Sequence, residues 1–226
     1  MKKRVGILIS GRGSNMKALV EAARDPAYPA EIAVVISNRP EAAGLAWAKA
    51  QGLPAAVIDH TATACRDGAA TRPVTRAAFE EQMHETLVAH GVELVACCGF
   101  MRLMTLDFVD VWRDRMINIH PSLLPAYTGL RTHERALADG VRIVGCSVHV
   151  VRAEMDSGPM IAQAAVAVLA GDTVEALAAR VLAAEHVLYP HALALFASGR
   201  ARVEGEVVRL TDAAGPPPPP LVWPPV

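Results

Sequence analysis

The first half of the chain alternates between short, almost wholly apolar runs and longer segments whose apolar residues recur every three or four positions. Short apolar runs are typical of strands buried on both faces of a parallel sheet, and the longer spacing is typical of amphipathic helices. The predicted strands are residues 4–10, 31–37, 54–59 and 92–98, and the predicted helices are residues 16–24, 41–51 and 74–90. This alternation predicts an α/β fold with a doubly wound, mostly parallel, Rossmann-like sheet.

The second half of the chain has a different pattern. Met116 and Ile117 end a further buried strand, and residues 142–151 and 160–168 are β-rich runs joined by a polar turn. We expect these two runs to pair as an antiparallel C-terminal extension of the sheet. The remaining predictions are a loop at 60–73, a short helix at 131–138, a long helix from Asp172–Glu175 to about Phe196, and a hairpin at 203–210.

No internal repeat and no long linker divides these elements. A chain of 226 residues can bury the core of one α/β domain or of two small ones. We therefore expect a single domain over residues 1–213, with an N-terminal half of about 1–100 and a catalytic half of about 100–213. Residues 214–226 are rich in proline and predict a disordered or polyproline tail.

Composition narrows the class of protein. Hydrophobic residues make up 52% of the chain, yet no apolar run reaches the roughly 20 residues of a membrane-spanning helix. The basic start, Met1–Arg4, precedes an apolar run too short for a signal peptide, so we expect a cytoplasmic protein. The net charge of -1 and the lack of a long Lys/Arg block argue against nucleic acid as the main partner. The cysteines show no CxxC spacing, and we expect reduced core residues at Cys65, Cys97, Cys98 and Cys146.

The loop Gly11–Asn15 lies between the first strand and the first helix. Such a loop presents backbone N–H groups and the positive end of the helix dipole to a phosphate. A dinucleotide fingerprint needs a small residue where Met16 stands and an acidic residue after the second strand, where the chain has Ser37–Arg39. No Gly-Lys-Ser/Thr follows, so a small phosphate monoester is the better expectation. The alternative is a tight turn before a helix.

The segment Asn118–Pro125 is the most distinctive in the chain. Positions two apart in an extended backbone point to the same side, so Asn118 and His120 can face one pocket. Pro121 and Pro125 stiffen the loop that follows. An amide donor and a titratable ring on a rigid segment suit the stabilisation of an oxyanion. The alternative is a turn that merely ends a strand.

Asp156 lies in a Met-Asp-Ser-Gly-Pro turn, which by itself is ordinary turn chemistry. If this turn folds over the edge of the sheet, the carboxylate could reach His120 and favour its imidazolium form. His149, in the preceding strand, could face the same pocket or lie in the core. The histidine spacing does not favour a metal, and neither a Gly-x-Ser-x-Gly motif nor a cysteine in a basic setting points to a nucleophile.

Five motifs, taken together and in this order, resemble the phosphoribosylglycinamide formyltransferases (GAR transformylases) of the formyltransferase family. The resemblance covers about residues 4 to 210, and the motifs are Gly11–Asn15, Gly99–Arg102, Asn118–Pro125, Gly129–His133 and Asp156–Pro159. It implies direct transfer of a formyl group from 10-formyltetrahydrofolate, the co-substrate, to the amine of glycinamide ribonucleotide in purine biosynthesis. No metal is implied.

The resemblance also implies roles for individual residues. The catalytic trio would be Asn118, His120 and Asp156. The ribonucleotide would contact Gly13, Ser14, Asn15, Arg76 and Glu185. The folate would contact Met101, Arg102, Leu103, Met104, Asn118, Val151 and Asp156, with the rest of the 152–156 loop nearby.

Two departures and several rivals accompany this resemblance. Leu182 stands where the family often has glutamine, and Thr128 stands where proline is common. The nearest rival is formyltetrahydrofolate deformylase or another formyl-folate transferase, such as methionyl-tRNA formyltransferase. A rival of another class is a non-catalytic nucleotide-binding module, which would not need Asn118, His120 and Asp156 together. The expected partners are the two small-molecule substrates, with neither nucleic acid nor membrane, and the expected assembly is a monomer or homodimer.

Overall fold

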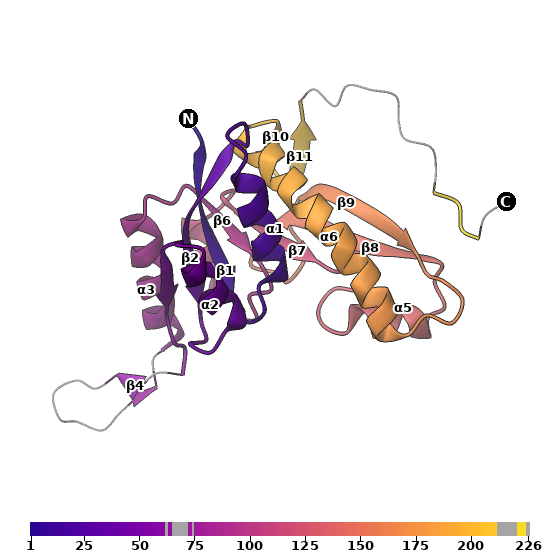
Figure 1. Cartoon of the computed structure of the whole chain (residues 1–226), viewed down its shortest axis with the longest axis horizontal. Helices are drawn as coiled ribbons and strands as arrows, with labels where there is room; N and C mark the ends of the chain where they lie inside the picture. Colours follow the sequence, from indigo (N-terminus) through magenta and orange to yellow (C-terminus); the bar gives the residue numbers. More distant parts are fainter. Residues whose placement is uncertain (62, 65–71, 74, 212–220, 225–226) are drawn as a thin grey trace. The chain divides into compact units, whose positions relative to one another are not determined.

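The structure, a computed structural model, describes residues 1–61, 63–64, 72–73, 75–211 and 221–224 (Figure 1). The chain forms two compact units, residues 1–116 and 117–226. The predictions for Cys65, for the helix start at Val74 and for most of the proline-rich tail lie outside the described residues. Within the tail, Trp223 donates a hydrogen bond from Nε1 to the Val168 carbonyl oxygen at 2.9 Å.

The first unit contains the predicted parallel sheet. Its strands lie in the order β3, β2, β1, β6, and every neighbouring pair is parallel. Their bounds are Ala55–Val57 (β3), Ala30–Ser37 (β2), Lys3–Ile9 (β1) and Leu94–Cys97 (β6). Because the strands run the same way, the loops that follow β1, β2 and β6 leave the sheet at one edge, as predicted for a ligand-binding edge.

Helices cover both faces of this sheet. The helices are α1 (Ser14–Ala23), α2 (Ala43–Ala50) and α3 (Arg76–Ala89). Successive residues of a strand point to opposite faces. A side chain at Gly6 of β1 would collide with Leu87 of α3, whereas one at Gly44 of α2 would lie 2.9 Å from Ile9 Cδ1, on the other face of β1. The doubly wound arrangement predicted from the sequence is therefore confirmed.

Short elements are where the sequence-based prediction failed. The segment 60–73 was expected to be a loop, but Thr63–Ala64 (β4) and Arg72–Pro73 (β5) pair as antiparallel strands. Two-residue strands show no periodicity, so a hydrophobic pattern cannot reveal them. A further helix, α4 (Leu106–Val111), was not predicted. Its N-cap residue, Thr105, bonds through its N–H and hydroxyl to the buried carboxylate of Glu80 on α3.

The second unit contains the antiparallel extension. Strand β8 (Ile143–Val150) pairs in antiparallel fashion with both β7 (Met116–His120) and β9 (Met160–Ala167). Helix α6 (Val174–Ala197) packs along β8 and β9, and the shorter α5 (Thr132–Ala138) contacts α6 (Figure 1). The predicted terminal hairpin is present as β10 (Ala201–Glu204) and β11 (Val207–Leu210).

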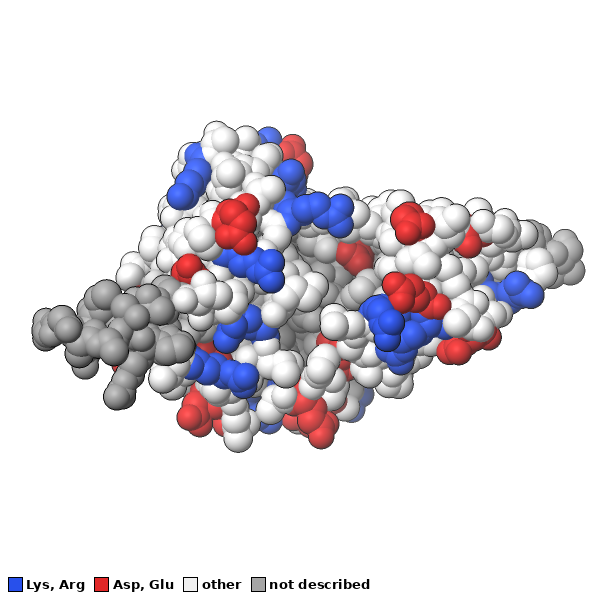
Figure 2. All heavy atoms as spheres, turned by 90° about the horizontal axis from the view of Figure 1, so that it is seen from below, with Lys and Arg blue, Asp and Glu red and all other residues white. Residues whose placement is uncertain are grey.

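Three features bear on the class of protein. Cys97, Cys98 and Cys146 are buried, and burial raises the pKa of the Cys97 thiol to about 12. In the part of the chain that the structure describes, no helix combines the length and apolarity that crossing a bilayer requires. On the face shown in Figure 2, acidic and basic side chains are interspersed rather than gathered by sign.

Candidate active site

The paired strands β7 and β8 bring three of the candidate side chains together. Asn118 and His120 lie two residues apart on β7, and their register partners on β8 are His149 and Ser147. Residues directly opposite each other in an antiparallel pair have adjacent side chains. The Asn118 amide nitrogen, Nδ2, accordingly lies 3.2 Å from His149 Nε2. Extended backbone at Asn118 and His120, expected from the sequence, is confirmed.

The turn after β8 carries Asp156 to His120. Asp156 adopts a left-handed backbone with φ of 55°, and its side chain is only 9% exposed. Its Oδ2 lies 3.4 Å from His120 Nδ1 and accepts a 2.8 Å hydrogen bond from the Gly129 backbone N–H. Two residues further on, a side chain at Gly158 would overlap the Val150 carbonyl oxygen, so this turn needs glycine there. The conditional expectation that Asp156 reaches His120 is met in the geometry.

Both ring nitrogens of His120 face acceptor oxygens. Nε2 donates to the Tyr127 carbonyl oxygen at 2.9 Å, and Nδ1 faces Asp156. A neutral imidazole has one N–H, whereas an imidazolium has two. The ring is buried and has an acceptor oxygen at each nitrogen.

His149 behaves differently, although it lies beside the same carboxylate. Burial lowers its pKa, and the positive charge of His120 acts in the same direction. The Val150 carbonyl and Asp156, whose Oδ1 is 3.8 Å from Nε2, oppose this shift without reversing it. The neutral ring donates from Nδ1 to the Val150 carbonyl oxygen at 3.1 Å, so the Nε2 lone pair can accept from Asn118. Sequence reasoning left the place of His149 open; the structure puts it against the trio.

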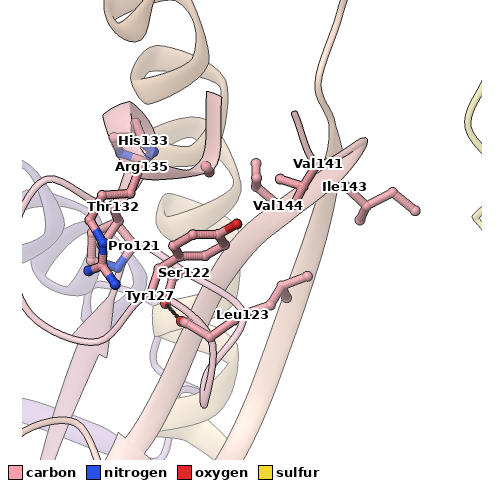
Figure 3. A pocket seen from close by; sticks show the side chains of 12 residues that line it. Pro121, Ser122, Leu123, Tyr127, Thr132, His133, Arg135, Val141, Ile143 and Val144 are labelled. Carbon is pink, nitrogen blue, oxygen red and sulfur yellow. Dashed lines mark hydrogen bonds between the residues drawn. The ribbon is translucent and has the colours of Figure 1, made fainter. Parts of the chain in front are cut away.

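A pocket of about 350 Å³ lies next to this cluster. In Figure 3 the segment after His120, helix α5 and strand β8 turn side chains toward it. Its lining residues are Pro121, Ser122, Leu123, Ala126, Tyr127, Thr132, His133, Arg135, Ala136, Val141, Ile143 and Val144. Burial, followed by the charge of His120, lowers the pKa of His133. The lining does not include Asn118 or His120.

The glycine loop of the first unit has the conformation expected of an anion-binding loop. Gly13 caps α1 with φ of 66°, and Lys17 N–H makes the first intrahelical bond, to the Gly13 carbonyl. The N–H groups of residues 14–16 therefore lie at the open end of the helix. Helix α2 packs closely on this loop, since Gly44 N–H donates to the Gly11 carbonyl at 3.0 Å. Ser14 is half-buried and Asn15 is buried.

Four of the residues predicted to contact the folate, Met101 to Met104, lie in the first unit. Met101 N–H donates to Ser10 Oγ at 2.8 Å, which ties the loop after β6 to the end of β1. The side chains of Met101 and Leu103 are exposed, Met104 is half-buried, and the Arg102 guanidinium lies 5.2 Å from the centre of the Phe79 ring. The loop thus offers apolar side chains to solvent.

The other predicted ligand contacts are spread over both units. Arg76 is the exposed first residue of α3 in the first unit. In the second unit, Val151 is half-buried directly after β8, and Glu185 is buried on α6. Leu182, the departure from the family pattern, is half-buried one turn before Glu185. Among the described residues, no group of three or more His, Cys, Asp or Glu side chains is arranged to hold a metal ion.

Two contacts of the trio come from the backbone, and sequence reasoning missed both. The Tyr127 carbonyl and the Gly129 N–H hold His120 and Asp156. Every residue carries such groups, so no residue type marks them. The only signal available was the glycine itself, at the start of the Gly129–His133 motif.

The chain is similar to known proteins. A family model described as formyl transferase matches residues 3–193. The phosphoribosylglycinamide formyltransferase of Escherichia coli is 36% identical over 93% of this chain and 95% of its own length. A glycinamide ribonucleotide transformylase 1 from Symbiobacterium toebii, of known crystal structure, is 45% identical, with a TM-score of 0.85 over 93% of this chain and 95% of that chain.

Longer proteins are also similar. The trifunctional purine biosynthetic protein adenosine-3 of Bos taurus is 44% identical over 93% of this chain. This chain spans only 20% of the length of that relative. The family match covers most of the present sequence, including Asn118, His120 and Asp156, and we conclude that the chain belongs to the formyl transferase family.

Proposed function

We propose that the protein transfers the formyl group of 10-formyltetrahydrofolate to the amine of glycinamide ribonucleotide, a step of purine biosynthesis. The observation that carries this proposal is the placement of the Asp156 carboxylate on His120, beside Asn118, in a chain of the formyl transferase family. Relatives named phosphoribosylglycinamide formyltransferase or glycinamide ribonucleotide transformylase match nearly the whole chain, which supports glycinamide ribonucleotide as the acceptor.

The trio can supply the chemistry that formyl transfer requires. Attack of an amine on the formyl carbon places negative charge on the formyl oxygen. Asn118 would donate one N–H to that oxygen while its amide stays anchored to His149 Nε2. His120 would stabilise the same charge as an imidazolium. Its Nε2 proton would reach the departing nitrogen, directly or through a water, when the hydrogen bond to the Tyr127 carbonyl opens, and the attacking amine would release its proton to water. Asp156 would keep His120 charged and oriented.

The ribonucleotide would use the open helix end for its phosphate. The N–H groups of residues 14–16 and the dipole of α1 suit a phosphate monoester. Gly13 would contact the phosphate through its backbone; its φ of 66° and the close approach of Met16 and Gly44 favour glycine there. Ser14 and Asn15 would add polar contacts. We assign the remaining contacts to Arg76 and Glu185. Leu182 cannot donate or accept a hydrogen bond, so one contact made by glutamine in the family is replaced or lost here.

The residues assigned to the folate fit a flat, partly apolar ligand. Met101 and Leu103 expose apolar side chains that could cover an aromatic ring. Arg102 and Met104 would complete this side, and Val151, Asn118 and Asp156 would contact the formyl-bearing end. The co-substrate supplies the formyl group, and the chain supplies charge, orientation and a proton.

We further infer that the chain works as one domain over residues 1–213, in the cytoplasm, as a monomer or homodimer, with small molecules and no nucleic acid as partners. The net charge of -1 and the interspersed charges in Figure 2 support the last point.

The decisive experiment is an assay of the purified protein with 10-formyltetrahydrofolate, with and without glycinamide ribonucleotide, that measures tetrahydrofolate and the formylated product. We expect turnover only when the ribonucleotide is present. Equal release of tetrahydrofolate without it would instead identify a deformylase, the alternative among formyl-folate enzymes. Ribonucleotide binding without any turnover would identify a binding module and contradict the enzyme proposal.

A further inference from the structure

The backbone of residues 127–129 holds both members of the charged pair. The Tyr127 carbonyl accepts from His120 Nε2 at 2.9 Å, and the Gly129 N–H donates to Asp156 Oδ2 at 2.8 Å. A displacement of this short segment by about 1 Å would stretch both bonds, and misplacement on that scale can cost a large part of an enzyme's rate. The geometry of His120 and Asp156 therefore depends on what holds the segment.

The backbone conformation of residues 127–131 is not intrinsically favourable. Every second residue from 127 to 131 adopts the left-handed region, with φ of 55° at Tyr127, 77° at Gly129 and 56° at Arg131. Glycine adopts this conformation without strain, but each of the other two costs roughly 1–2 kcal/mol. Such residues persist only where their surroundings fix them.

One side of helix α5 makes the contacts that fix it. Arg135 donates from Nη1 to the Thr128 carbonyl at 2.6 Å and to the Leu130 carbonyl at 3.5 Å. These two carbonyls flank Gly129. The same guanidinium lies 5.4 Å from the centre of the Tyr127 ring, as Figure 3 allows the reader to follow.

Asp139 adds a second contact from the same side of the helix. The Tyr127 hydroxyl donates to Asp139 Oδ2 at 2.9 Å. Arg135 and Asp139 are four residues apart, so a helix presents them on one face. Helix α5 and its C-cap residue therefore contact the segment through the Tyr127 side chain and through the backbone carbonyls of Thr128 and Leu130.

We propose that Arg135, assisted by Tyr127 and Asp139, is a positioning residue that sets the geometry of His120 and Asp156 for formyl transfer. This inference rests on the proposed function. Arg135 is itself exposed and touches none of the trio, so it acts through the backbone of residues 127–130. Its bonds to carbonyl oxygens are charge-assisted, and such bonds are stronger than those between neutral groups.

The test compares Arg135→Met with Arg131→Met. Both remove a guanidinium and keep an unbranched side chain. Arg131 is exposed, and its Nε lies 3.9 Å from Glu134 Oε2 in an exposed ion pair. We expect Arg135→Met to lower kcat roughly tenfold at nearly unchanged KM for both substrates. The reason is the loss of one or two hydrogen bonds that orient the backbone of residues 127–130. Arg135→Lys should restore part of this loss, and Arg131→Met should resemble the unsubstituted protein.

A second readout does not require turnover. Ring ¹⁵N-edited NMR of the ligand-free protein reports the His120 Nε2–H, which the Tyr127 carbonyl protects. We expect faster solvent exchange of this proton, and shifted ring signals, in Arg135→Met and Tyr127→Phe but not in Arg131→Met. Circular dichroism confirms that each variant is folded; if Arg135→Met is not, Arg135→Lys and Tyr127→Phe carry the comparison.

An unchanged kcat, or unchanged His120 ring signals, in folded Arg135→Met would overturn the positioning role. A rise in KM for either substrate at unchanged kcat would overturn it as well. If the unsubstituted protein shows no formyl transfer at all, the proposed function fails, and the NMR comparison still decides whether Arg135 positions His120.

Discussion

At the scale of residues, a single carboxylate oxygen of Asp156 organises the candidate site. Oδ2 accepts from the Gly129 N–H and faces His120 Nδ1, while Oδ1 lies 3.8 Å from His149. Two histidines thus surround one carboxylate, and each has a carbonyl oxygen at its other ring nitrogen, that of Tyr127 for His120 and that of Val150 for His149; only His149 also has the Asn118 amide beside the nitrogen that faces Asp156. Burial lowers the pKa of His149, and its neutral ring donates to the Val150 carbonyl and accepts from Asn118.

The first prediction concerns the charged pair. His120→Ala and Asp156→Asn should each lower kcat by about a hundredfold or more, since general acid–base and charge stabilisation are both lost. Ribonucleotide binding, measured by calorimetry, should stay within a few-fold. Glu154→Gln is the matched control, because Glu154 is exposed on the same turn. A fully active Asp156→Asn variant would contradict the assigned roles.

The second prediction concerns His149. His149→Met removes the acceptor that orients the Asn118 amide, and the loss of one hydrogen bond worth about 1 kcal/mol should lower kcat roughly five- to tenfold. His149→Gln can present an oxygen near the position of Nε2 and should retain more activity. The measurement is kcat at saturating substrates for both variants. Equal losses would mean that His149 serves only to fill the core.

At the scale of elements, the start of α6 is fixed by a charged network. Arg180 bonds both oxygens of Asp172, at 2.7 and 2.8 Å, and also donates to the Ala167 carbonyl at the end of β9. Asp172 additionally accepts from Leu169 N–H. The hydrogen bonds from Arg180, followed by the one from Leu169, lower the pKa of Asp172 to about 2. This network joins β9 to α6.

The third prediction follows from that pKa. An aspartate in the unfolded chain has a pKa of about 3.9. Because the folded value is lower, the ion pair stabilises the protein fully above pH of about 4, and this contribution disappears as the pH falls toward about 2. Asp172→Asn should therefore lower the thermal midpoint at pH 7, and the difference from the unsubstituted protein should shrink below pH of about 4. A difference independent of pH would contradict the assignment.

The fourth prediction concerns the turn between β8 and β9. A methyl group at Gly158 would overlap the Val150 carbonyl oxygen, which is backbone and cannot move aside cheaply. Gly158→Ala should lower the free energy of unfolding by more than about 3 kcal/mol, the range of severe substitutions. Gly171→Ala is the control: φ there is 79° but nothing lies within 4 Å, so the cost should be about 1 kcal/mol. Urea unfolding measures both.

At the scale of the whole molecule, the boundary between the two compact units falls inside a strand. Met116 ends the first unit and Ile117 begins the second, yet both belong to β7 and both are buried. Independent domains are usually joined by exposed, flexible segments. The single-domain organisation expected from the sequence stays a prediction, and the cooperativity of unfolding tests it.

The fifth prediction tests this point. Thermal unfolding should show one cooperative transition, with equal calorimetric and van't Hoff enthalpies. In a Trp223→Phe variant, the fluorescence of Trp47 and Trp112, both in the first unit, should change at the same urea concentration as the circular dichroism of the whole chain. Two separated transitions would show that residues 1–116 and 117–226 fold independently.

The sequence by itself determined the order and type of the long elements. Buried parallel strands and amphipathic helices leave periodic patterns, so β1, β2, β6, α3 and α6 were predicted close to their observed bounds. The paired strands β4 and β5 and the six-residue helix α4 are too short for such a pattern and were missed. The resemblance carried by the five motifs also named Asn118, His120 and Asp156 as the candidate trio.

Only the tertiary structure decided which groups meet. The distance between Asp156 and His120 depends on a turn with a left-handed aspartate and on Gly158, and no local pattern fixes a contact across 36 positions of sequence. The contacts from the Tyr127 carbonyl and the Gly129 N–H use groups that every residue possesses. The place of His149 followed from its register opposite Asn118, which the pairing of β7 with β8 sets. Local patterns therefore specify elements, whereas register and turn geometry specify the site.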